Sequence, residues 1–72
     1  MEEIKITTEF IKLDQFLKFA NITENGADAK YVIVNGYVKV NGETEIRRGR
    51  KLYREDTVDI DYEGDRFSLK VV

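Results

Sequence analysis

Apolar residues early in the chain recur at the spacing of an amphipathic helix. They stand at positions i, i+3, i+4 and i+7 of one stripe: Leu13, Phe16, Leu17 and Ala20. This spacing predicts a helix over about residues 12–21 with one buried face. Before it, Ile4 and Ile6 alternate with a lysine, which predicts a short N-terminal strand.

A second helical repeat follows after a short linker. Ala29, Val32 and Ile33 repeat the i, i+3, i+4 spacing, so we predict a helix over about residues 26–34. Asn25 is a typical N-cap residue, because its side chain can accept a hydrogen bond from a free backbone amide at the helix start. The linker is short, and we therefore expect the two helices to pack against each other.

After the second helix the apolar period changes to two, as in β-strands. Asn35-Gly36 is typical of a helix end, and Asn41-Gly42 is typical of a tight hairpin turn. A second hairpin is predicted at Glu63–Asp65, followed by a strand whose inward residues are Phe67, Leu69 and Val71. The pattern therefore predicts a single α+β domain over residues 1–72, with two packed N-terminal helices followed by a small antiparallel sheet.

Composition limits the possible kinds of site. The 72 residues include no cysteine and no histidine, which excludes disulfides and thiolate or imidazole metal sites. No apolar run approaches the roughly 18 residues of a membrane-spanning helix. We expect a soluble, cytoplasmic protein that uses no membrane, metal or cofactor.

Charge is strongly divided along the chain, although its formal net value is only -2. Residues 30–54 hold seven Lys or Arg against two Glu, a net of +5, whereas residues 1–29 and 55–66 carry -3 and -5. Such a division produces one cationic face and favours a polyanionic ligand.

Paired carboxylates are the remaining candidates for catalysis. Asp59 and Asp61 alternate with apolar residues, which predicts that they lie on the outer face of an edge-type strand. Charged residues there commonly prevent edge pairing of strands. The sequence also has no nucleotide-binding or metal-binding motif. We expect no catalytic residue and no enzymatic activity.

The densest charge lies in the run Arg47-Arg48-Gly49-Arg50-Lys51. Arginine presents a planar fork of donors that suits phosphate oxygens. Tyr31 and Tyr37 are predicted outside the core, where they could stack on RNA bases beside this charge. Ordinary packing is the alternative role for both rings.

Three motifs carry a resemblance to a known family. They occur in this order: Lys12-Leu13-Asp14-Gln15-Phe16-Leu17, then Ala29-Lys30 with Val32-Ile33, then Asn35-Gly36-Tyr37-Val38-Lys39-Val40-Asn41-Gly42. The set resembles the RNA-binding domain named after ribosomal protein S4, also called the alpha-L motif. The basic run that follows is similar to that of a small, stand-alone, ribosome-associated branch. The resemblance covers about residues 12–60.

The resemblance implies a protein that binds RNA across its two-helix face and the following strand, without catalysis. We expect it to be a monomer. The partner would be ribosomal RNA or a ribosomal subunit, and the role ribosome assembly. The implied RNA-binding residues are Lys12, Lys30, Lys39, Arg47, Arg48, Arg50 and Lys51. Two departures stand out: Gly26-Ala27 replaces the family's Ser-Arg pair, and Glu55-Asp56 replaces Gly-Asp.

A protein–protein interaction module is the alternative function. Its basic loop would dock an acidic partner, because electrostatic steering serves either ligand. Free structured RNA should displace the partner if the protein binds RNA. It should have little effect if the basic loop docks an acidic protein at a separate site.

Overall fold

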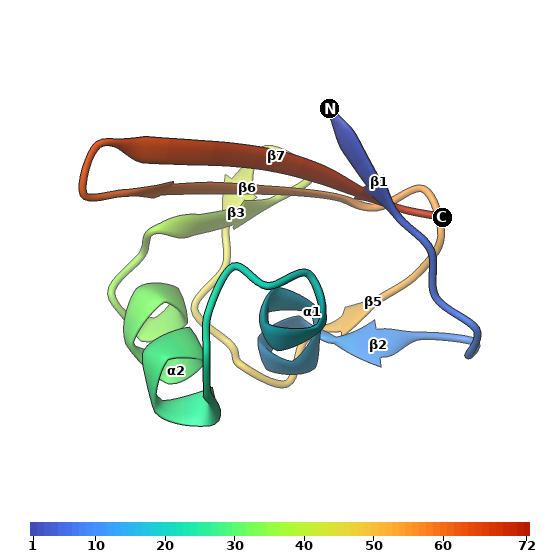
Figure 1. Cartoon of the computed structure of the whole chain (residues 1–72), viewed down its shortest axis with the longest axis horizontal. Coiled ribbons are helices and arrows are strands. Elements are labelled where there is room, and N and C mark those ends of the chain that lie inside the picture. Colours follow the sequence, from blue (N-terminus) through green and yellow to red (C-terminus); the bar gives the residue numbers. More distant parts are fainter.

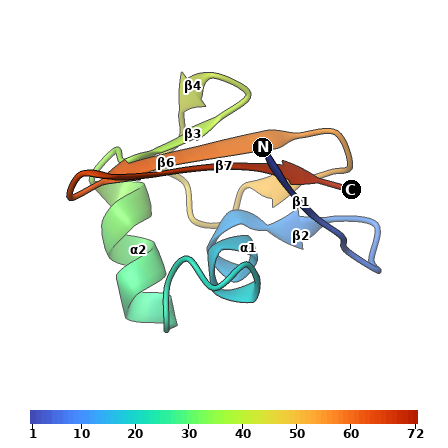
Figure 2. The same cartoon turned by 45° about the horizontal axis from the view of Figure 1, so that its top comes forward.

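Two helices lie against one face of a five-stranded sheet, and a two-stranded ribbon lies beside the first helix (Figures 1 and 2). The computed structural model describes residues 1–72. The helices are α1 (Leu13–Phe19) and α2 (Gly26–Val34). The strands are β1 (Glu2–Ile4), β2 (Ile11–Lys12), β3 (Val38–Val40), β4 (Glu43–Thr44), β5 (Lys51–Leu52), β6 (Thr57–Tyr62) and β7 (Asp65–Val71). The sheet order is β1-β7-β6-β3-β4, and β2 pairs with β5 to form the ribbon.

Both predicted helices form. α1 is shorter than residues 12–21, because Lys12 is extended and Asn21, just beyond the helix, has a φ of 61°. α2 has the predicted bounds, and the N-cap is confirmed: Asn25 Oδ1 accepts a hydrogen bond from the Asp28 amide at 2.9 Å. Gly36 follows α2 with a φ of 83°, the left-handed conformation that ends many helices. Neither helix is long and apolar enough to cross a membrane.

Both predicted hairpins are confirmed. Asn41 and Gly42 have φ values of 52° and 85°, and Glu63 and Gly64 have values of 53° and 83°. Positive φ at both central residues characterises the type I′ turn, whose twist matches that of the flanking strands. These turns join β3 to β4 and β6 to β7 in antiparallel pairs.

The sheet is mixed, which corrects the predicted antiparallel sheet that follows the helices. β1 precedes both helices and pairs in parallel with β7, so that Glu2 lies beside Leu69 and Ile4 beside Val71. The Ile6 amide extends this pairing by donating to the Val72 carbonyl at 2.9 Å. The ribbon was also not predicted, because strands of two residues are too short to show alternation.

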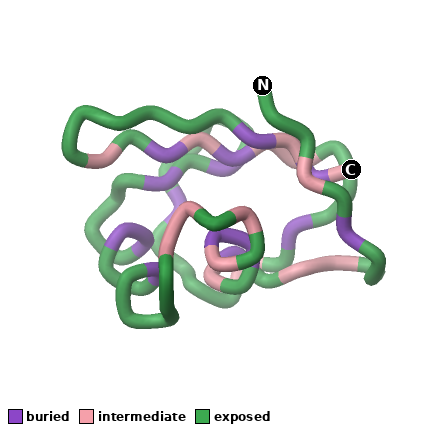
Figure 3. Tube along the Cα trace, in the orientation of Figure 1, coloured by how far each residue is buried: buried purple, intermediate pink, exposed green.

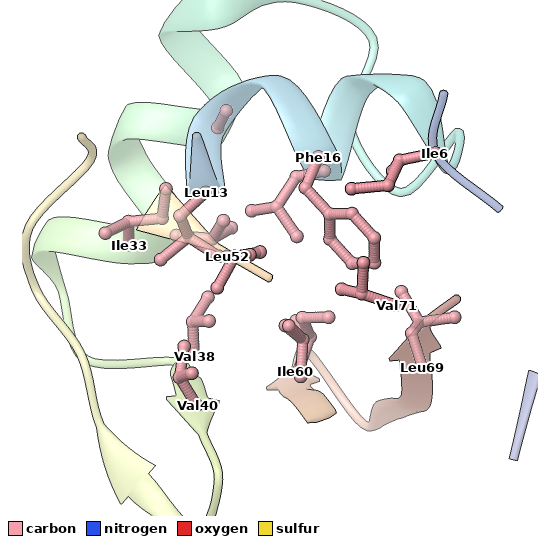
Figure 4. Close-up of a cluster of buried hydrophobic side chains, with 14 residues drawn as sticks. Ile6, Leu13, Phe16, Ile33, Val38, Val40, Leu52, Ile60, Leu69 and Val71 are labelled. Atoms are coloured by element: carbon pink, nitrogen blue, oxygen red, sulfur yellow. The ribbon is translucent and has the colours of Figure 1, made fainter. Parts of the chain in front are cut away.

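The core fills the space between the helices and the sheet (Figures 3 and 4). It is one cluster of buried apolar residues: Ile6, Leu13, Phe16, Leu17, Ala29, Val32, Ile33, Val38, Val40, Leu52, Val58, Ile60, Leu69 and Val71. Phe67, predicted to point inward, is instead 40% exposed. β1 pairs with β7 only from Leu69 to Val71, so Phe67 lies on the part of β7 that has a neighbouring strand on one side alone.

Candidate nucleic-acid interface

Residues Arg47–Lys51, here called the basic loop, are docked through their backbone onto the start of α1. The Arg50 carbonyl accepts from the Leu13 amide at 2.8 Å, and the Arg48 carbonyl accepts from the Asp14 amide at 3.1 Å. The first amides of a helix have no partner within the helix, so the loop satisfies groups that would otherwise need water or a cap. The main chain of the loop is therefore held at the start of α1.

Glu45 neutralises part of the basic loop. Its carboxylate accepts from Nε and Nη2 of Arg47 at 3.0 and 2.9 Å, from the Arg47 amide at 3.1 Å, and from Arg50 Nη1 at 2.9 Å. Glu45 is only 6% exposed. Hydrogen bonds from Arg47, aided by Arg50 and opposed by burial, lower the pKa of Glu45 to about 2. We call this arrangement the Glu45 clamp.

Glu45 is a site residue that the sequence analysis did not identify. The one available signal was an acid two residues before Arg47 in an otherwise basic segment. The clamp orients Arg47 and Arg50 and leaves them with different exposures. The Arg47 side chain remains 71% exposed and that of Arg50 31%.

Three cations near the loop take no part in the clamp. Arg48 is exposed and forms no salt bridge. Lys12 and Lys51 are also exposed, and they are cross-strand neighbours in the ribbon. Lys51 Nζ lies 4.8 Å from the centre of the Phe10 ring. The start of α1 and the loop thus bring Lys12, Arg48 and Lys51 into one region.

The other two predicted site residues lie elsewhere. Lys30 is exposed on α2, in the helix layer. Lys39 lies opposite Asp59 on the sheet, and the buried Val38 and Val40 on either side of it point to the helices. Because side chains alternate along a strand, Lys39 points to the outer face, away from the helices. The structure therefore does not bring Lys39 together with the basic loop.

Residues 4–69 match the family model described as the S4 domain. This chain belongs to the S4 domain family. It is also 48% identical over 58 residues to the "Probable ribosome maturation protein RlbA" of Bacillus subtilis (strain 168), and this alignment covers 81% of the chain and 82% of that protein. The resemblance to the S4-type RNA-binding domain is thereby confirmed, and the family match extends to both sides of residues 12–60.

The two tyrosines considered for base stacking pack against each other in this S4 domain. The ring centres of Tyr31, Tyr37 and Tyr62 lie 4.8 to 6.4 Å apart. Tyr31 and Tyr62 also line an open groove between α2 and the β6–β7 hairpin, here called the acidic groove. Its charged residues are Glu24, Asp28, Glu63 and Asp65. Tyr31 and Tyr37 remain 50% and 37% exposed, which confirms that they lie outside the core, and their rings pack on each other, that of Tyr31 beside acidic rather than basic residues.

The carboxylate pair of the S4 domain has structural partners. β6 lies between β7 and β3, so the prediction of an edge-type strand is wrong. Asp59 Oδ1 accepts a hydrogen bond from Ser68 Oγ at 2.6 Å, and Asp61 forms a salt bridge with Arg66 at 3.2 Å. Both carboxylates therefore serve to join β6 to β7 on the outer face of the sheet.

Proposed function

We propose that this S4 domain protein binds structured ribosomal RNA and acts in ribosome maturation by binding alone. Membership of the S4 family supports RNA as the ligand. The printed name of the Bacillus subtilis relative supports a role in ribosome maturation. The observation that carries the proposal is the basic loop, which is held on α1 by backbone hydrogen bonds and leaves Arg47 and Arg48 exposed.

Phosphate contacts supply most of the affinity in this proposal. Lys12, Arg48 and Lys51 make direct contacts, because they are exposed and form no salt bridge with the chain's own carboxylates. Arg47 contributes through its exposed part, and Arg50 positions the loop through the Glu45 clamp. Contacts to phosphates set the position of an RNA, and the shape of its helix provides selectivity.

Lys30 and Lys39 have separate roles in the proposal. Lys30 extends the contact along α2, on the helix layer that also carries the basic loop. Lys39 touches RNA only where the ligand reaches the outer face of the sheet, because it points away from the helices. Its contribution should be the weakest of the seven cations.

Crosslinking in cells, followed by sequencing of the bound RNA, tests the function. The wild type should enrich one region of ribosomal RNA, and Arg48→Ala should lose that enrichment. Arg66→Ala is the matched control, because it removes an exposed arginine outside the site. A flat profile, identical in all three proteins, would contradict RNA binding and favour an acidic protein as the partner.

The salt dependence of affinity tests the mechanism. Neutralising about four phosphates should give a slope of log K against log salt concentration of roughly -3 to -4. A slope near zero with binding retained would show that phosphates are not the main contact. Sedimentation at low and high salt tests the accompanying proposal of a cytoplasmic monomer, since pairing of opposite charges between copies would appear only at low salt.

A further inference from the structure

The outer face of the ribbon carries two aromatic and two cationic side chains. In the ribbon, Ile11 lies opposite Leu52 and Lys12 opposite Lys51. Continuing this register by one residue sets Phe10 opposite Tyr53, and their ring centres are 6.0 Å apart. Since side chains alternate along strands, all four outward residues share one face. We call Phe10, Lys12, Lys51 and Tyr53 the ribbon platform.

The inner side of the ribbon anchors the platform to the core. Leu52 is fully buried, and Ile11 packs partly buried against the core cluster. On the outer side, Tyr53 remains 46% exposed. Lys51 Nζ lies over the Phe10 ring at 4.8 Å, so that ring already has a cationic partner. Tyr53 is therefore the open aromatic surface of the platform.

The segments that carry the two rings are held in place by hydrogen bonds. Arg54 donates to the Thr8 and Ile6 carbonyls at 3.0 and 2.9 Å, which ties the segment before Phe10 to the segment after β5. The Tyr53 amide donates to Asp56 Oδ2 at 2.8 Å. An aromatic surface that is fixed before binding loses little conformational freedom when a ligand stacks on it.

The surrounding charge indicates which aromatic ligand the platform would accept. Lys12 and Lys51 flank the rings, and the basic loop leads directly into β5. Two carboxylates that follow Tyr53 have partners in the chain: Asp56 accepts the Tyr53 amide, and Glu55 pairs with Lys70 at 2.9 Å. Glu9, next to Phe10, forms no salt bridge, so two lysines outnumber one free carboxylate at the platform. A nucleotide combines a flat ring with a phosphate, and both parts match this surface.

We propose that the ribbon platform stacks an unpaired base of the bound RNA on Tyr53, while Lys12 and Lys51 contact the adjacent phosphates. This inference rests on the proposed function and narrows its ligand. The preferred RNA has a bulge or loop beside the paired segment that the basic loop contacts. The stacking surface therefore lies on the ribbon rather than at Tyr31, whose ring borders the acidic groove, or at Tyr37, whose ring packs against Tyr31 and Tyr62.

The test uses two synthetic RNAs: a blunt duplex, and the same duplex with one bulged adenosine. Tyr53→Leu should weaken binding of the bulged RNA about tenfold and leave binding of the blunt duplex unchanged, because only the bulge offers a base to stack. Tyr53→Phe retains the ring and should bind both RNAs like the wild type. Arg48→Ala should weaken binding of both, since it acts through phosphates.

A fluorescent reporter tests stacking directly, because the chain contains no tryptophan. Tyr53→Trp should lose fluorescence on adding the bulged RNA and not on adding the blunt duplex. Phe67→Trp is the matched control at an exposed aromatic position beside the acidic groove. Its fluorescence should change with neither RNA.

The outcomes separate the platform from the proposed function. If Tyr53→Leu binds the bulged RNA as tightly as the wild type while Arg48→Ala weakens both RNAs, the platform is wrong and the function stands. Equal weakening of both RNAs by Tyr53→Leu also overturns stacking. If the wild type binds neither RNA even at low salt, where phosphate contacts of any sequence are strongest, the function and the platform both fail.

Discussion

Two surface regions of this small domain each combine aromatic rings with clustered charge. One is the basic loop together with the ribbon, and the other is the acidic groove. At the groove, the rings of Tyr31 and Tyr62 pack together and the four carboxylates form no salt bridge. At the loop, Glu45 and the start of α1 hold the charged segment in place, and Tyr53 packs on Phe10. Tyr31 and Tyr53 are similarly exposed, at 50% and 46%, so the two regions differ in the sign of their charge and in the contacts that hold the charged segment, not in how open their rings are.

The two regions also shift ionisation in opposite directions. Arg47 lowers the pKa of Glu45 to about 2, whereas burial, followed by the charge of Glu63, raises the pKa of Tyr62. The lowered pKa of Glu45 reflects its arginine partners, whereas the raised pKa of Tyr62 reflects burial first and the neighbouring negative charge second. A phosphate is attracted to the first region and repelled by the second, so the charge distribution orients an approaching RNA.

The largest expected effect comes from removing the anchor of the ribbon. Leu52→Ala should lower the free energy of unfolding by about 2 to 5 kcal/mol, because Leu52 is fully buried and joins β5 to the core. Phe67→Ala at the groove should cost less than about 1 kcal/mol, because its side chain is 40% exposed. Urea unfolding measures both. Equal losses would mean that the groove is as much a part of the core as the ribbon.

Removing the charge of the Glu45 clamp should have the next largest effect. Glu45→Gln should lower the free energy of unfolding at neutral pH by about 1.5 to 3 kcal/mol, since it weakens hydrogen bonds between charged groups. For a domain of this size each 1 kcal/mol corresponds to about 4 to 8 °C in Tm. Asp61→Asn is the control, because its salt bridge to Arg66 is exposed.

The same clamp predicts a dependence on pH. Above pH 4.5 Glu45 is ionised in the folded and unfolded chain, so its contribution to stability is complete. As the pH falls from 4.5 towards about 2, the unfolded chain takes up the proton first and that contribution is lost. The gap in Tm between wild type and Glu45→Gln should therefore narrow over this range. A constant gap would show that the ion pair does not stabilise the fold.

Much of the fold could be predicted because its signals are local. The helix stripes, the Asn25 cap and the two turns each depend on residues close in sequence. The parallel pairing of β1 with β7 joins opposite ends of the chain, and the ribbon joins residues 11–12 to 51–52. Neither pairing leaves a periodic pattern, because both segments are short. The α+β class is confirmed, and these two features account for the corrections to the predicted sheet.

The site was predicted less completely, for two physical reasons. Charge density identified the basic loop, but counting charges could not show that Glu45 already binds Arg47 and Arg50. Side-chain direction also matters: alternation in β3, between the buried Val38 and Val40, turns Lys39 to the outer face. That direction was available from the period-two pattern, whereas the clamp depends on a loop conformation that has no sequence signal of its own.

A smaller effect is expected from removing single arginines of the basic loop, and Arg48→Ala and Arg47→Ala should differ in their effect on Tm. Arg48→Ala should weaken RNA binding about three- to tenfold, reduce the salt slope by about 1 and leave the Tm unchanged, because Arg48 has no salt bridge. Arg47→Ala should lower the Tm as well, since it removes two side-chain hydrogen bonds to Glu45. Titration with RNA beside thermal unfolding checks both variants. A loss of stability in Arg48→Ala would contradict its proposed role.

The smallest effect should come from neutralising the acidic groove. The double change Glu63→Gln with Asp65→Asn removes two carboxylates that face away from the proposed site. Only long-range repulsion of RNA is relieved, and salt screens it over about 8 Å at physiological ionic strength. We expect RNA affinity to rise less than about twofold at that salt concentration and more at low salt.

The same double change decides whether the two regions are functionally distinct. If it lowers RNA affinity, the groove takes part in binding and the division into one RNA-binding surface and one repelling surface is wrong. If it raises RNA affinity strongly at physiological salt, RNA passes close to the groove, and Tyr31 is again a candidate for base stacking. A small rise that disappears with added salt is the result expected of a surface that acts on RNA only through its field.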